Sequence, residues 1–152
     1  MAFRFSLETL LRHRRHLEDR AGTELAQFQR LAQDESDRLA HLREIERWSQ
    51  DEFRQAQDRG VAGWELNLLQ DYRGRLEDEI LAATARLRQW EGEITRLQAE
   101  VVERRKGRRV VETLRGHQWE SWRRMVDRLA QRQLDEAASI QQRRRANGES
   151  NG

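Results

Sequence analysis

The 152-residue sequence contains no cysteine, no proline and a single lysine, Lys106. Without cysteine there can be no disulfide framework and no thiolate metal site. Without proline the chain lacks the residue that kinks helices, which suits long uninterrupted helices. No stretch approaches the roughly 18 apolar residues of a membrane span, and the start lacks a signal-peptide core. We therefore expect a soluble protein that the general secretory route does not export.

What is present is charge, at 37% of residues, against 36% hydrophobic residues. This mixture can cover a thin helical seam but hardly a thick core. The charge is uneven: residues 1–99 hold 16 basic and 19 acidic residues, whereas residues 100–152 hold 13 and 8. The basic end could meet an acidic protein, nucleic acid or anionic lipid.

An apolar seam with steps of four and three residues runs between Leu76 and Val101. Steps that average 3.5 residues keep one helix face toward a neighbouring helix, which specifies a left-handed coiled coil. No polar residue interrupts the seam, which consists of Leu76, Ile80, Ala83, Leu87, Trp90, Ile94, Leu97 and Val101.

The pattern predicts an all-α fold, a long antiparallel two-helix coiled coil or helical hairpin. Ser6 is the predicted N-cap of a first arm over about 6–59. Gly60 and Gly63 permit a tight reversal, so a tip is predicted at 60–63. The second arm is predicted over about 64–145, which makes 1–146 a single hairpin domain. The polar residues 147–152 are expected to be a disordered tail.

Folding the chain back at the glycines places residues opposite each other when their numbers add to about 123. Arg104 and Arg108 then fall in seam positions, where the seam should be weakest. Residues from about 118 to 145 have no partner arm, and their apolar side chains should seek another surface. The alternative is that they cover Phe3 and Phe5 of the same chain. The candidate docking residues are Trp119, Trp122, Arg123, Arg124, Met125, Val126 and Leu129.

No residue pattern indicates an enzyme, a cofactor site or a phosphate-binding loop. His13 and His16 have a spacing that metals use, but no acidic residue completes a convincing ligand set. The basic runs at 104–109 and 143–145 could contact phosphates, although interspersed acidic residues favour a solvated helix face.

The opening "FRFSLETLLRHRRHLEDRA" has an aromatic, a basic and an aromatic residue before Leu-Glu-x-Leu-Leu. In this pattern the sequence resembles the start of the flagellar export protein family FliJ. Trp64 after the glycine-containing tip also matches. "QRQLDEAA" near the end resembles the family's terminal Asp-Glu-Ala signature. Further matches lie at Leu76, Ile80, Leu87, Trp90, Glu112 and Leu114.

The resemblance implies a non-enzymatic, stalk-like coiled coil of the flagellar type III export apparatus. It implies that the open end of the hairpin docks into the ring of the export ATPase FliI. It also implies contacts with the cytoplasmic domain of the export gate FlhA and with export chaperones, and a place at the cytoplasmic face of the inner membrane. The alternatives are the equivalent stalk of a virulence secretion system and a basic coiled coil that binds nucleic acid. The gate-facing patch implied by the resemblance is Leu42, Ile45, Trp48, Tyr72 and Leu76.

Overall fold

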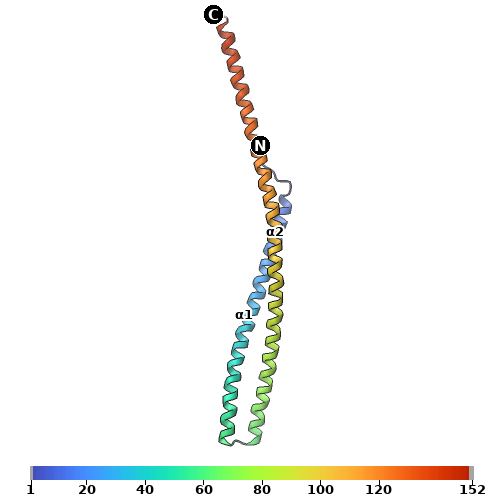
Figure 1. Ribbon diagram of the computed structural model, residues 1–152, viewed down its shortest axis with the longest axis vertical. Coiled ribbons are helices and arrows are strands. Elements are labelled where there is room, and N and C mark those ends of the chain that lie inside the picture. The colour runs from blue at the N-terminus through green and yellow to red at the C-terminus, as the bar shows by residue number, and fades with distance from the viewer. Residues whose placement is uncertain (1, 151–152) are drawn as a thin grey trace. The chain divides into compact units, whose positions relative to one another are not determined.

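The computed structural model describes residues 2–150 and consists of two helices, α1 (Glu8–Arg59) and α2 (Gly63–Glu149). Figure 1 shows that α2 returns alongside α1 after a short turn. The described residues contain no strand. The predicted all-α helical hairpin is therefore confirmed.

The turn between the helices depends on Gly60, whose φ of 70° lies in the left-handed region. Its N–H donates to the carbonyl of Gln57 at 3.2 Å, and the N–H of Val61 donates to the carbonyl of Ala56 at 3.3 Å. This pair of bonds is a Schellman motif, which satisfies the last carbonyls of α1. The carbonyl of Ala62 accepts the first bonds of α2 from Glu65 and Leu66, so the turn comprises residues 60–62.

The helix ends differ in detail from those predicted. The carbonyl of Leu7 accepts a hydrogen bond from the N–H of Leu11, which places the N-cap at Leu7 instead of Ser6. α2 begins at Gly63, one residue before the predicted start. It continues to Glu149, so residues 147–149 of the predicted tail are helical. Residues 151 and 152 lie outside the described part of the chain.

The chain divides into two compact units, and the single hairpin domain over 1–146 stays a prediction. Unit 1 comprises Met1–His16 and Arg105–Gly152, and unit 2 comprises Leu17–Arg104. The division falls where Arg104 and Arg108 take seam positions. Because a charged side chain contributes little apolar burial there, each unit has its own hydrophobic cluster.

Unit 2 pairs the two helices in antiparallel order through an apolar cluster of Leu39, Leu42, Leu76 and Ala83, flanked by Ile45, Ile80 and Leu87. The rings of Phe28 and Trp90 lie 5.5 Å apart, and Arg86 pairs with Glu35 at 2.9 Å. All eight seam residues from Leu76 to Val101 are buried or half-buried. The periodic face therefore lies against α1.

Unit 1 has a smaller core in which Phe5, Leu11 and Val111 are buried, with Phe3, Leu7 and Leu10 packed around them. Two ion pairs join its helices, Arg115 to Glu8 at 3.1 Å and Arg15 to Glu112 at 3.3 Å. As residue numbers rise along α1 they fall along α2. The pairing is antiparallel here too.

Candidate functional site

The part of α2 that follows Trp122 lacks a facing helix. We call residues 123–149 the overhang. Every residue from 127 to 150 is exposed, and Val126 alone of residues 123–126 is half-buried. The exposed fractions are 42% for Met125 and 39% for Leu129. Large apolar side chains that stay in water on a helix face form a surface suited to a partner.

The apolar face of the overhang continues the face that buries Val111 in unit 1. Trp122, Met125 and Leu129 follow one another in steps of three and four residues, which keeps them on one side of the helix. A partner helix could therefore extend the same packing that α1 provides earlier along α2. Leu134 and Ile140 add exposed apolar surface further on.

Arginines outnumber acidic residues in the overhang. The overhang holds seven arginines and four acidic residues. The guanidinium of Arg123 lies 5.4 Å from the ring centroid of Trp119, an indole that is 40% exposed. Arg124 pairs with Glu120 one turn away at 3.5 Å. A surface with exposed tryptophan and arginine has the composition typical of binding hot spots, and its charge favours an acidic partner.

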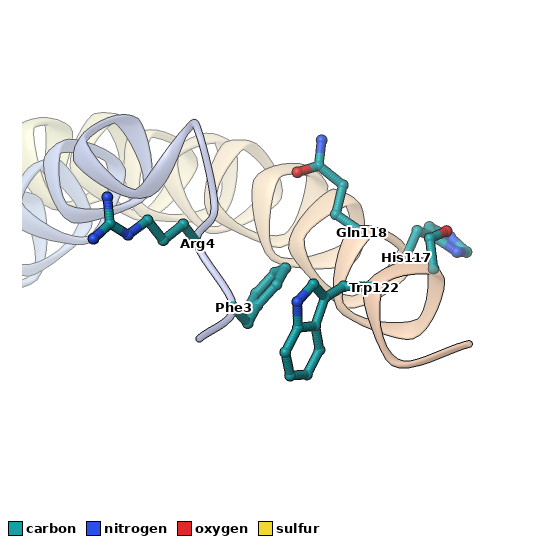
Figure 2. A pocket seen from close by; sticks show the side chains of 6 residues that line it. Phe3, Arg4, His117, Gln118 and Trp122 are labelled. Carbon is teal, nitrogen blue, oxygen red and sulfur yellow. The ribbon is translucent and has the colours of Figure 1, made fainter. Parts of the chain in front are cut away.

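Trp122 has a partner within its own unit, because the N-terminal segment lies against it. The Phe3 and Trp122 rings lie 5.8 Å apart at an angle of 51°. Figure 2 shows the two rings next to each other, with Phe3 on the segment that precedes α1. Phe5 is buried in the core of unit 1. The predicted unpartnered stretch thus begins after Trp122, later than Gln118, and the self-covering alternative applies to Phe3, Phe5 and Trp122.

The residues of the predicted gate-facing patch separate into two groups in unit 2. Leu42 and Leu76 are only 6% and 5% exposed and belong to the core. Ile45 packs half-buried against that core. Trp48 and Tyr72 are 58% and 41% exposed.

Next to this patch lies an exposed apolar stripe that was not predicted from the sequence. Trp64 and Leu68 are 65% and 56% exposed, and they precede Tyr72 in steps of four residues on α2. Residues four apart lie on one face of a helix. The four-residue spacing of Trp64, Leu68 and Tyr72 was the feature of the sequence that could have predicted this stripe.

Two arginines of the basic run at 104–109 pair with glutamates one helical turn away. Arg104 lies 3.7 Å from Glu100, and Arg108 lies 2.7 Å from Glu112. Glu112 also accepts from Arg15, and these bonds, with that from Arg108 foremost, lower the pKa of Glu112. Such internal pairing leaves less charge for phosphate contacts. It favours the solvated-face interpretation of this run.

Gly107 gives Arg14 room to reach α2 within unit 1. A Cβ at position 107 would lie 3.1 Å from Nη1 of Arg14, while Nε of Arg14 is buried without a hydrogen-bond partner. Arg14 as a whole is half-buried, and a partly desolvated arginine at a helix contact weakens packing because its charge is costly to desolvate. This contact explains a helical glycine in the run.

Among residues 2–150, no cluster of three histidine, cysteine or acidic side chains could hold a metal ion. His13 and His16 are both exposed. In the same part of the chain, neither helix has an apolar stretch long enough to cross a membrane.

The fold and the exposed face define a class of protein, the antiparallel coiled-coil hairpin with an unpaired helical extension. Comparison with protein families gives a match to the family described as "Flagellar FliJ protein" over residues 3–147. No curated protein and no solved structure shows significant similarity to the chain.

The chain belongs to the FliJ family, because the match covers nearly its whole length. It is therefore a protein associated with flagellar export, in a family of non-catalytic components of that apparatus. The predicted resemblance is confirmed.

Proposed function

We propose that this chain is a stalk-like component of the flagellar export apparatus whose overhang docks into the ring of the export ATPase FliI. The observation that carries the proposal is the exposed apolar face of Met125 and Leu129, preceded on the same helix by the exposed Trp119, whose ring Arg123 covers. A face of this kind on an unpaired helix fits a groove with apolar floor and acidic rim. Docking buries the face and promotes assembly and activity of the ring.

The test is the rate of ATP hydrolysis by the ring ATPase of the same export system with and without the purified chain. We expect stimulation by the natural chain and no hydrolysis by the chain alone. Met125→Ala combined with Leu129→Ala should reduce stimulation, and so should Trp119→Ala combined with Trp122→Ala. The first pair is cleaner, because its residues lie in the overhang, away from the Phe3 contact.

Trp64→Ala is the matched control, since Trp64 is an exposed indole of the same helix near the turn. It should leave stimulation unchanged. Circular dichroism should show retained helicity in every variant. Unchanged stimulation in the Met125 and Leu129 double variant would remove the overhang from the docking surface.

The second part of the proposal assigns the gate contact to Trp48 and Tyr72. These are the two exposed members of the patch, and the buried Leu42 and Leu76 hold the helices beneath it. Through this contact the chain links the ATPase ring to the cytoplasmic domain of FlhA at the inner membrane, where export chaperones also meet it.

Trp48→Ala with Tyr72→Ala should weaken capture of the FlhA cytoplasmic domain on an affinity resin, while ATPase stimulation stays intact. Leu81→Ala is the control, because Leu81 is 68% exposed in the same unit. Equal capture by the double variant and the natural chain would contradict this assignment.

A further inference from the structure

The N-terminal residues of unit 1 form a short flap on α2. We define the flap as residues 2–4, which precede the buried Phe5 and the first turn of α1. No regular secondary structure holds these three residues. Phe5, at 8% exposure, anchors the chain behind them. The flap is therefore anchored at its Phe5 end.

The contacts of the flap converge on Phe3. Its ring lies 5.8 Å from that of Trp122, and the guanidinium of Arg115 lies 5.9 Å from its centroid. Arg115 is itself held by Glu8 at 3.1 Å. One aromatic pair and one cation–π contact at a half-exposed site are each modest. Together they keep the flap against Trp122, but they are weak enough for a partner to displace it.

The flap covers the first residue of the face that continues into the overhang. Trp122 is half-buried, whereas Trp119, Met125 and Leu129 on the same helix are exposed. Beside the flap lies an open hollow of about 340 Å³, lined by Phe3, Arg4, His117, Gln118, Ser121 and Trp122. Figure 2 shows Phe3 and Trp122 at this hollow. The cover is thus incomplete, and solvent reaches its edge.

We propose that the flap is an autoinhibitory cover of Trp122, which a docking partner must displace. This inference rests on the proposed function of the overhang. A partner that packs against Trp122 needs the ring face that Phe3 occupies, so the two compete. Displacement moves only residues 2–4, because Phe5, Leu11 and Val111 remain packed behind them. Docking affinity is reduced by the free energy of opening the flap.

The first test needs no partner and uses the full-length chain. Selective ¹⁵N labelling of tryptophan gives indole N–H signals, and a Trp122→Phe variant assigns that of Trp122. A soluble paramagnetic agent broadens signals according to their exposure. Phe3→Ala should increase broadening of the Trp122 signal and leave Trp48, in unit 2, unchanged. Arg4→Ala is the matched control within the flap and should change neither signal.

The second test measures binding of the same variants to the ring ATPase. Phe3→Ala should tighten binding roughly threefold to tenfold, the range expected for one aromatic pair. Arg115→Ala should act in the same direction, since it removes the cation–π contact. Far-UV circular dichroism checks that each variant keeps its helices.

The outcomes separate the two proposals. If the natural chain does not bind the ATPase, the docking proposal fails, and the broadening experiment still decides whether the flap covers Trp122. If Phe3→Ala weakens binding, Phe3 belongs to the docking surface and the autoinhibitory proposal is overturned. Unchanged binding, or unchanged broadening of Trp122, overturns it as well.

Discussion

Replacing Leu11 by alanine should loosen unit 1 while unit 2 stays closed. Leu11 is fully buried, and with Phe5 and Val111 it makes up the buried part of the unit 1 core. Leu97 is its counterpart, fully buried in unit 2. The two residues are identical in type and burial, so the comparison isolates the unit in which each lies.

The magnitude follows from the lost packing. A buried leucine replaced by alanine costs about 2–5 kcal/mol, depending on how far the cavity collapses. With so few buried neighbours in unit 1, we expect about 3 kcal/mol, which raises the population of the opened unit roughly 100-fold. Local opening of this kind exposes backbone amides without global unfolding.

Amide hydrogen exchange followed by mass spectrometry measures this effect. Leu11→Ala should accelerate exchange at residues 8–16 and at the facing residues 108–118, with little change at 63–97. Leu97→Ala should accelerate exchange mainly in unit 2. Equal acceleration across both units by either change would refute the reasoning, because the helices would then open as one body. Absence of protection at 8–16 in the natural chain would refute it too.

Three further predictions concern the turn, a buried hydroxyl and an ion-paired carboxylate. Ser49 is 1% exposed and its Oγ has no hydrogen-bond partner. Ser49→Ala should therefore stabilise the chain by about 1 kcal/mol, measured by thermal unfolding followed by circular dichroism. A lowered unfolding midpoint would contradict this. Gly60→Ala should destabilise the chain by about 1–2 kcal/mol, because the φ of 70° disfavours a Cβ, and Gly60→Asn should cost less. Glu112 has a pKa below its ordinary value of 4.5, so its stabilising effect is present at neutral pH and is lost as pH falls through the lowered pKa. Because its side chain is 35% exposed, the effect should stay below about 1 kcal/mol, and Glu112→Gln should flatten the acid limb of a stability–pH curve; an unaltered acid limb would count against the Arg108 and Arg15 bonds.

The paired part of the fold could be predicted from the sequence because heptad spacing encodes it. The residues from Leu76 to Val101 follow the 3.5-residue period, and a face with that period packs against a single neighbouring helix. The glycines at 60 and 63 fixed the place of reversal to within one residue. Opposing pairs such as Glu8 and Arg115 follow the predicted register.

The patch near the turn shows where sequence reasoning was less specific. Leu42 and Leu76 occupy positions of the periodic stripe, and such positions are core positions before they are binding positions. Their burial follows from that periodicity. Trp48 lies outside the positions of the periodic stripe and is exposed. Helical periodicity therefore separates the core residues of the patch from its exposed ones.

The N-terminal contact with Trp122 could not be predicted with the same certainty. Residues 2–4 are not helical, so no periodicity indicates which side chain faces inward. The helical state of residues 147–149 was also missed. Asn147 and Gly148 have low intrinsic helix propensity, but an established helix of 87 residues can extend through them without a new nucleation step.

The position of the turn also determines when contacts form during synthesis of the chain. Arg73 lies 5.2 Å from the ring of Phe53, and few residues separate this pair along the chain. Phe3 and Trp122, in contrast, are separated by most of the sequence. Short loops close at lower entropic cost, so pairing should start beside Gly60 and proceed away from it. On the ribosome, Phe3 cannot meet Trp122 until about two thirds of the second helix has been synthesised, so its ring remains exposed to water for most of translation.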